Sequence, residues 1–151
     1  LAELGGEEGR VIAFDIQQDA VDSTRALLQE KGYQDRVEVF LDSHSNMDQY
    51  AEENTVDCIT FNFGYLPGGN HNIFTTPATS IPAIEKGLKL LKQGGLMSLC
   101  VYYGGDSGFE EKDALMEYFR TIDSKQYTVL ITEFANRPNN PPIPVFILKQ
   151  I

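Results

Sequence analysis

Cysteine is scarce in this sequence, which argues against a fold held together by disulfides or by a cysteine-rich metal site. Only Cys58 and Cys100 occur in 151 residues, far apart and each inside an apolar, β-like run. Such thiols are typical of small, reduced core residues. His44 and His71 have no second histidine at metal-ligand spacing, so the sequence predicts no metal site.

Long apolar runs are also missing. The longest, such as Leu-Met-Ser-Leu-Cys-Val at 96–101, fall far short of the ~20 residues that a membrane-spanning helix needs. No charged segment followed by an apolar stretch opens the chain, as it would in a secretory signal. We therefore expect a cytoplasmic protein with no membrane partner.

Positive charge is the third shortage, with 12 Lys and Arg against 22 Asp and Glu and a net charge of −10. Tight, non-specific binding of nucleic acid depends on basic residues that neutralise phosphates, so it is disfavoured here. An RNA substrate would have to be held by a local patch and by pocket contacts. Lys86, Lys89 and Lys92 share one helical face, which is typical of a solvated surface and could also face phosphates.

Short β-rich runs alternate with helical patterns along the chain. We predict strands over 10–16, 36–42, 56–63, 96–103, 127–134 and 144–151, and helices over 19–32, 45–54, 80–95 and 109–123. Alternation of this kind indicates right-handed crossovers and a mostly parallel sheet. The last two strands have only a proline-rich loop between them, so they should form an antiparallel hairpin at the sheet edge. The length and the 42% hydrophobic content predict one α/β domain over 1–151.

Three local signals place helix ends. The first residues, Leu-Ala-Glu-Leu before Gly5-Gly6, are typical of a helix's last turn and its glycine stop, so we expect further chain upstream. The spacing of Ser45 and Asp48 resembles a capping box for the helix that follows. Gly94-Gly95 predicts the end of the helix that contains Pro82 near its first turn.

Polar residues follow the first two strands, and ligands of doubly wound sheets bind at such carboxyl ends. Asp15 could accept hydrogen bonds from two ribose hydroxyls, with Gln17 as a second polar contact. The alternative is that Asp15 caps the next helix, although Asp19 is better placed for that. Ser43 and His44 follow the second strand, where they could line a ligand or form an ordinary capping turn.

The third strand runs into Asn-Phe-Gly-Tyr-Leu-Pro-Gly-Gly-Asn at 62–70. The glycines and the proline explain a turn but not the amide and the phenol. The Asn62 side chain could orient an amine nucleophile, Gly64 could make room for it, and Tyr65 could stack on a base. A tight turn with a packed tyrosine is the alternative. Further Gly, Asn and aromatic residues at 68–75, 102–108 and 135–142 follow other strands and should meet at the same edge.

These motifs resemble the rRNA methylase family of class I S-adenosylmethionine-dependent methyltransferases. The resemblance covers essentially the whole chain and is carried by 13–17, 42–47, 62–69, 85–108 and 136–142. It implies a Rossmann-like class I methyltransferase fold: a mostly parallel, twisted sheet with a C-terminal antiparallel hairpin. It also implies S-adenosylmethionine as cofactor and methylation of the 5-aminomethyl group of a wobble 2-thiouridine in the anticodon region of tRNA. A homodimer is left open.

The resemblance also implies roles for single residues. The residues implied for cofactor binding are Asp15, Gln17, Ser43, His44 and Asn62. The residues implied for the acceptor site and catalysis are Asn62, Gly64, Tyr65 and His71. Tyr103 stands where relatives often have His, which argues against a fixed acid–base role there.

Family members begin with a strand and a glycine loop of the form Asp-Ala-Thr-x-Gly-x-Gly that wraps the cofactor's methionine part. This first strand is absent from the chain, in which Leu1 would lie in the helix after that loop. We expect the segment upstream of Leu1 because a sheet without its central strand would leave backbone groups unpaired.

Two other functions fit parts of the sequence. A nicotinamide-dependent oxidoreductase is compatible with Asp15 but not with the terminal hairpin. A non-catalytic RNA-binding module is disfavoured by the net charge of −10.

Overall fold

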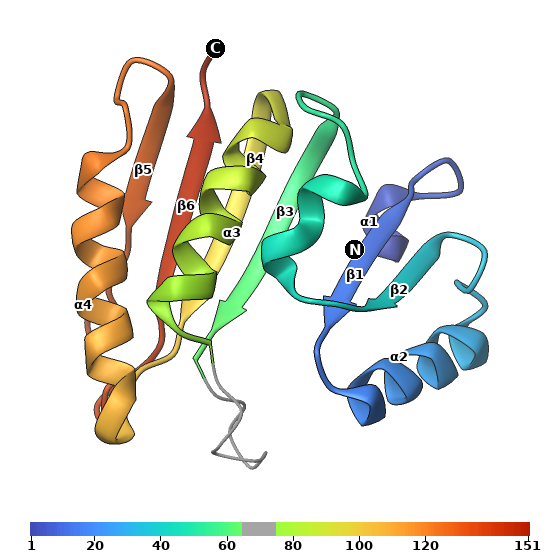
Figure 1. The fold of residues 1–151 in the computed structure, drawn as a ribbon, viewed down its shortest axis with the longest axis horizontal. Helices are drawn as coiled ribbons and strands as arrows, with labels where there is room; N and C mark the ends of the chain where they lie inside the picture. Colours follow the sequence, from blue (N-terminus) through green and yellow to red (C-terminus); the bar gives the residue numbers. More distant parts are fainter. Residues whose placement is uncertain (65–74) are drawn as a thin grey trace. The chain divides into compact units, whose positions relative to one another are not determined.

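The computed structural model describes residues 1–64 and 75–151, the side chains of 105–107 excepted (Figure 1). It divides into two compact units, Leu1–Tyr50 (unit 1) and Ala51–Ile151 (unit 2), each of which is described by itself. The prediction of a single domain over 1–151 stays a prediction. No helix in the described ranges is long and apolar enough to cross a membrane.

Unit 1 is a small α/β unit. Its elements in chain order are α1 (Ala2–Gly5), β1 (Val11–Asp15), α2 (Gln18–Lys31), β2 (Val37–Leu41) and the 3₁₀ helix η1 (His44–Gln49). Strands β1 and β2 pair in parallel, so that Asp15 and Leu41 end side by side. The glycine stop predicted at the end of α1 is present, since Gly6 has a φ of 68°.

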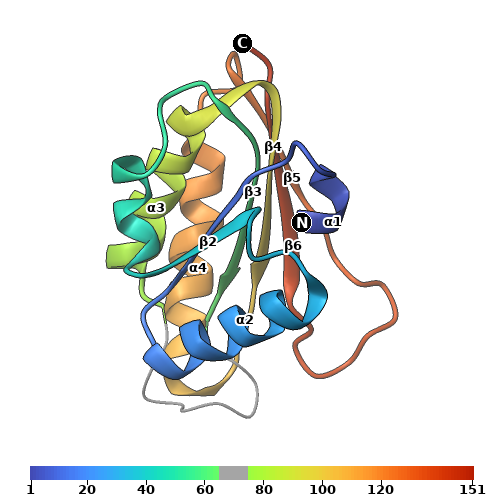
Figure 2. The same ribbon diagram turned by 90° about the vertical axis from the view of Figure 1, so that its right-hand side faces the viewer.

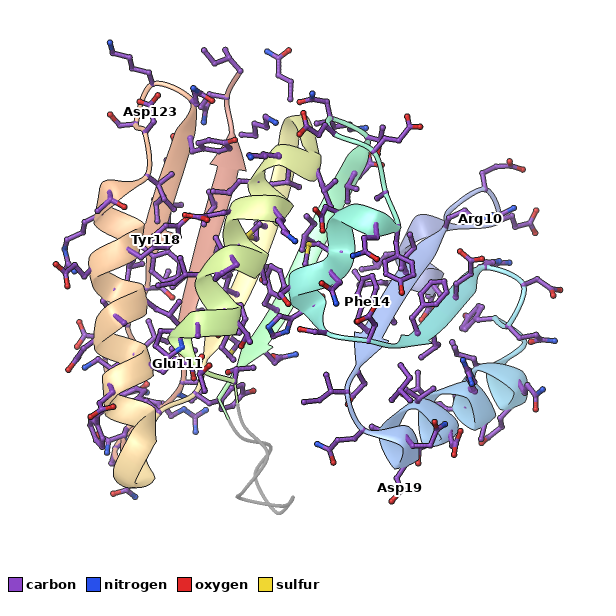
Figure 3. All side chains as sticks on the ribbon, viewed as in Figure 1. Arg10, Phe14, Asp19, Glu111, Tyr118 and Asp123 are labelled. Atoms are coloured by element: carbon purple, nitrogen blue, oxygen red, sulfur yellow. The ribbon has the colours of Figure 1, made fainter. Side chains whose placement is uncertain are left out.

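Aromatic packing and three buried side chains, those of Val21, Val39 and Met47, form the core of unit 1. The Phe14 ring lies 6.0 Å from that of Phe40, and the Tyr50 ring lies 4.9 Å and 4.4 Å from these two (centroid distances). Figure 3 shows Phe14 on β1 directed toward the segment that ends at Tyr50. Val21 on α2 is fully buried. This small core holds the carboxyl ends of β1 and β2 in place.

Unit 2 has a four-stranded mixed sheet in the order β3-β4-β6-β5. Its elements are β3 (Val56–Phe63), α3 (Pro77–Leu90), β4 (Leu91–Val101), α4 (Gly105–Thr121), β5 (Tyr127–Ile131) and β6 (Ile143–Lys149). Strands β3 and β4 pair in parallel, whereas β6 is antiparallel to both β4 and β5. The predicted antiparallel hairpin at the sheet edge is confirmed.

The core of unit 2 lies between this sheet and its two helices. Figures 1 and 2 show α3 and α4 on the same face of the sheet. Alternate residues of β4 face them, and Met97, Leu99 and Val101 are at most 1% exposed. Ile84 of α3 and Leu115 of α4 are fully buried against this face. The period-two pattern of β4 thereby fixes which side chains of the sheet point away from the helices.

Helix α3 ends earlier than the glycine signal predicted, at Leu90 instead of residue 95. The Lys149 Nζ of β6 donates to the carbonyls of Leu88 at 3.2 Å and Leu91 at 2.7 Å, which satisfies acceptors at the helix end. Gly94, with a φ of 77°, lies within β4 where its pairing with β3 shifts register. The expectation that Gly94-Gly95 ends the helix was therefore wrong.

Candidate functional site

The carboxyl ends of β1 and β2 meet in unit 1, as expected for neighbouring parallel strands. Besides the pairing of Asp15 with Leu41, the amide of Asp42 donates to the Asp15 carbonyl at 3.1 Å. The candidate residues after the two strands, Asp15 with Gln17 and Ser43 with His44, are therefore brought to one edge.

Asp15 shapes the turn that leads into α2. Its Oδ1 accepts a hydrogen bond from the Gln17 amide at 2.9 Å, and Gln17 is the N-cap residue of that helix. Among the described residues, the second oxygen, Oδ2, takes part in no hydrogen bond. Asp19, the better-placed candidate for a cap, lies exposed in the first turn and makes no capping bond (Figure 3). Asp15 therefore supports the turn with one oxygen and retains an acceptor for a ligand.

Asp42 organises the turn after β2. Its carboxylate accepts from the Ser43 amide at 2.7 Å, the Asn46 side chain at 2.8 Å and the Tyr50 hydroxyl at 2.7 Å. The Tyr50 bond, followed by those from Asn46 and Ser43, lowers the pKa of Asp42 below its ordinary value. The same bond is the main cause of the raised pKa of Tyr50. Sequence reasoning did not identify this pair as the support of Ser43 and His44.

Ser43 caps η1, as the capping alternative predicted. Its Oγ accepts from the Ser45 amide at 3.2 Å and lies 2.8 Å from the Ser45 Oγ. The capping box expected at Ser45 and Asp48 was wrong, because the tighter 3₁₀ turn places the cap at Ser43. Burial lowers the pKa of His44, which favours the neutral form of its imidazole. The backbone around Ser43 and a neutral ring are thus what this turn offers a ligand.

In unit 2, Asn62 lies on the open face of β3. Its neighbours Phe61 and Phe63 are 7% and 1% exposed and point to the helices, whereas Asn62 is exposed on the opposite face. It pairs in register with Cys100 of β4. Within the described part of the chain, the Asn62 side chain makes no hydrogen bond. Its amide is therefore available to an external group.

Gly64 follows β3 where the chain passes very close to β4. Its φ is 111°, and a Cβ at this position would lie 2.6 Å from the carbonyl oxygen of Tyr102. The Tyr102 amide in turn donates to the Phe63 carbonyl at 2.9 Å. The neighbouring backbone therefore requires glycine at this position. The sequence had instead suggested that Gly64 makes room for a substrate.

Gly64 and Thr75 flank residues 65–74 and are bonded to each other. The Gly64 amide donates to the Thr75 Oγ1 at 2.6 Å, and the Thr75 amide donates to the Gly64 carbonyl at 3.4 Å. Tyr65 and His71, both predicted at the acceptor site, lie outside the described residues. The structure therefore fixes the two ends of the predicted acceptor loop but not these two side chains.

A buried carboxylate, that of Glu111, contacts Thr75 at this site. Glu111 of α4 is 3% exposed and accepts hydrogen bonds from Thr75 and, at 2.5 Å, from the Ser80 hydroxyl. Figure 3 shows it on the side of α4 that faces α3. We call Glu111, Ser80, Thr75 and Gly64 the Glu111 network. Because it joins α4, α3 and the end of β3, it ties both ends of 65–74 to the helical layer.

The sequence itself holds a signal for Glu111. Glu111 stands four and eight residues before Leu115 and Phe119, which are 0% and 2% exposed, so it occupies a core position of the helix. A carboxylate at such a position needs hydrogen-bond partners, and sequence spacing does not reveal that Ser80 and Thr75 supply them.

The Glu111 network predicts a pH-dependent stability. Burial raises the pKa of Glu111 above its ordinary value of 4.5, and the bonds from Ser80 and Thr75 only partly oppose this. The protonated form is thus favoured in the folded state, so stability falls as pH rises from the unfolded pKa through the folded one. Glu111→Gln carries no such charge, and its Tm relative to wild type should increase from pH 4.5 to pH 8.

Thermal unfolding across that pH range measures the effect, with the neighbouring exposed residue Glu110→Gln as control. A difference between Glu111→Gln and wild type that stays constant with pH would show that Glu111 is not held with a raised pKa.

No group of three or more His, Cys, Asp or Glu side chains that could hold a metal occurs in the part of the chain that the structure describes. The two thiols are free. Cys100 forms a hydrogen bond with Tyr102 that is the main cause of the raised pKa of this phenol.

Comparison with known proteins gives a family match over most of the chain. Residues 11–148 match the family described as "Putative rRNA methylase". The chain is 38% identical over 146 residues to "tRNA (mnm(5)s(2)U34)-methyltransferase, chloroplastic" of Arabidopsis thaliana, a match that covers 94% of this chain and 53% of that protein. The chain thus spans about half the length of this curated relative.

Two solved structures of methyltransferases are also similar to this chain. A "putative rRNA-methylase" from Clostridium thermocellum is 46% identical with a TM-score of 0.94, over 99% of this chain and 80% of that one. A "putative methyltransferase" from Streptococcus mutans in complex with SAH is 36% identical with a TM-score of 0.83, over 93% of this chain and 76% of that one.

Proposed function

Because this chain belongs to the rRNA methylase family, we propose that it is part of an S-adenosylmethionine-dependent N-methyltransferase that acts on RNA. The predicted Rossmann-like class I methyltransferase fold is confirmed by the structural relatives. We further propose that the substrate is the 5-aminomethyl group of a wobble 2-thiouridine in the anticodon region of tRNA, the reaction for which the curated relative is named.

The observation that carries the proposal is the amide of Asn62. It lies exposed at the carboxyl end of β3 and makes no hydrogen bond within the described residues. An amine nucleophile needs neutral acceptors that orient its N–H bonds while its lone pair points at the methyl carbon. The Asn62 Oδ1 meets this need without carrying a charge.

The chain's own residues fit an S-adenosyl cofactor in unit 1. The free Oδ2 of Asp15 can accept from ribose hydroxyls, while Oδ1 keeps the turn in place. The turn at Ser43 and His44 can meet the adenine. When bound, the cofactor supplies an electrophilic methyl group on a sulfonium. The SAH complex of the Streptococcus mutans relative supports S-adenosylmethionine as the cofactor.

The energetics do not demand a strong general base. An alkyl amine with a pKa near 10.4 is neutral in about one molecule in 10³ at pH 7, a deficit of about 4–5 kcal/mol. Desolvation favours the neutral amine. Positioning can contribute about 7–11 kcal/mol. Asn62 and precise positioning of the amine can therefore suffice, which agrees with the absence of a carboxylate from the sequence at 62–70.

Asp15→Asn should weaken cofactor binding. The amide keeps an acceptor for the Gln17 N–H but loses the negative charge toward the ribose, so affinity for S-adenosylmethionine should fall about 10- to 100-fold. Isothermal titration of the full-length protein measures this, with Asp19→Asn in the first turn of α2 as control. Unchanged affinity in Asp15→Asn would refute the ribose assignment.

Thermal shifts separate the cofactor classes. S-adenosylmethionine should raise the Tm of the full-length protein and NAD should not; the reverse result would favour a nicotinamide enzyme. The antiparallel β5–β6 hairpin already disfavours that alternative.

A cytoplasmic location remains a prediction, which cell fractionation would test. A homodimer also remains a prediction, which sedimentation would test.

A further inference from the structure

A pocket lies in unit 2, apart from Asn62. It has a volume of about 360 Å³, within the range of small-ligand sites, about 300–1,000 Å³. Its lining comes from α4, from the end of β5 with the loop after it, from the start of β6, and from Tyr103: Tyr103, Lys112, Met116, Ile131, Thr132, Glu133, Phe134, Arg137, Pro141, Pro142 and Ile143. We call it the Arg137 pocket.

The pocket lies at the same end of the unit 2 sheet as Asn62 and Gly64. Phe63 of β3 pairs with Val101 of β4, and Val101 pairs with Ile143 of β6, which lines the pocket. Two strand spacings separate β3 from β6, about 10 Å. This span is short enough for one RNA strand to reach both the end of β3 and the pocket.

Two cations line the pocket in a chain that has few. The Lys112 side chain is 25% exposed, and its Nζ lies 3.2 Å from the Asp113 Oδ1 and 5.1 Å from the Tyr103 ring centroid. Arg137 is exposed and makes no ion pair or hydrogen bond with any described residue. Among the described residues of the lining, Glu133 is the one acid. Arg137 therefore offers a guanidinium that no described residue pairs with, and this is the group best suited to a phosphate.

Aromatic surface lies beside these cations. Phe134 is 44% exposed although it lines the pocket. Tyr103 is fixed edge-on against Phe109, with ring centroids 5.5 Å apart. An exposed ring next to a cation is the combination that holds a nucleobase and its phosphate in single-stranded RNA.

The loop that carries Arg137 is preorganised. The amide and the hydroxyl of Thr132 both donate to the Pro144 carbonyl, at 2.9 Å and 2.8 Å, which closes the base of the loop. Three prolines occur within 138–142, and Asn139 and Asn140 hold left-handed φ values of 62° and 51°. Asparagine tolerates this conformation and proline restricts its neighbours. Ligand binding would thus require little further ordering.

We propose that the Arg137 pocket binds a nucleotide of the substrate RNA other than the methylated one, with its phosphate on Arg137 and Lys112 and its base on Phe134. This inference rests on the proposed function, because it assumes that RNA reaches this sheet edge. It explains how a protein with a net charge of −10 can hold RNA locally.

The test compares Arg137→Ala and Phe134→Ala with Arg120→Ala in the full-length protein. Arg120 is an exposed arginine of α4 that does not line the pocket. Arg137→Ala should raise KM for tRNA about tenfold and reduce the slope of log affinity against log salt by about 1. Phe134→Ala should raise KM at least about fivefold and leave the salt slope unchanged. Neither should change kcat at saturating RNA, the affinity for S-adenosylmethionine, or the Tm.

Arg137→Ala with the KM and salt slope of Arg120→Ala would overturn the proposal. Fluorescence anisotropy with labelled tRNA makes the same comparison without turnover. A wild-type protein that transfers no methyl group would contradict the proposed function, and the anisotropy data would still decide on the pocket.

Discussion

Asn62→Ala should lower kcat for methyl transfer to tRNA by about 10²-fold, because a misplaced nucleophile costs about that much. The Asn62 amide makes no hydrogen bond in the described chain and its side chain is exposed, so its removal leaves no buried group unsatisfied. We therefore expect little change in Tm. Single-turnover kinetics with the full-length protein, at saturating cofactor and tRNA, measure the chemical step directly.

Thr60→Ala is the matched control for this variant. Thr60 lies two residues earlier on the same exposed face of β3 and should leave kcat unchanged. The resemblance also implies Asn62 in cofactor binding. The affinity of the Asn62→Ala variant for S-adenosylmethionine should therefore be measured in parallel. A loss of affinity as large as the loss of kcat would mean that Asn62 holds the cofactor or the fold, and not the acceptor amine.

Gly64→Ala should destabilise unit 2 by about 2–4 kcal/mol, because it combines a strained backbone with a steric clash. The residue has a φ of 111°, and a methyl group would meet the Tyr102 carbonyl oxygen at 2.6 Å. To relieve this contact, the ends of β3 and β4 must separate or the Gly64–Thr75 bonds must break. Either change displaces Asn62 or the two residues that flank 65–74, so activity should fall even in molecules that remain folded.

Gly94→Ala separates the cost of backbone strain from the cost of the steric clash. Gly94 also has a positive φ, 77°, but no atom lies within 4 Å of the position that a Cβ would take there. The substitution should cost only about 1 kcal/mol and leave methyl transfer intact. Chemical denaturation gives both free energies of unfolding. Equal losses in the two variants would show that the contact with Tyr102 does not constrain the loop.

Much of the fold follows from periodicity. Strand β3 has the predicted bounds, 56–63, because its apolar run and the glycine that follows give the same boundary. The C-terminal hairpin follows from the lack of room for a helix between its strands. The end of α3 does not follow from local sequence, because its last carbonyls are satisfied by Lys149, about sixty positions further along the chain.

The candidate site also combines features that the sequence can predict with features that it cannot. Asp15 and Asn62 could be proposed as site residues because they lie at the carboxyl ends of β1 and β3, where ligands of such sheets bind. The Asp42–Tyr50 bond, the Glu111 network and the Tyr102 carbonyl over Gly64 could not, since each depends on contacts that strand and helix patterns do not encode. These three features support the candidate residues and lie outside the sequence motifs.

The most direct test of the proposed function is methyl transfer to tRNA that carries 5-aminomethyl-2-thiouridine at the wobble position. The full-length protein and S-adenosylmethionine should convert this nucleoside to its N-methylated form, as seen by mass spectrometry of the digested tRNA. Binding of tRNA and cofactor without formation of the methylated nucleoside would contradict the proposed function and favour a non-catalytic RNA-binding role.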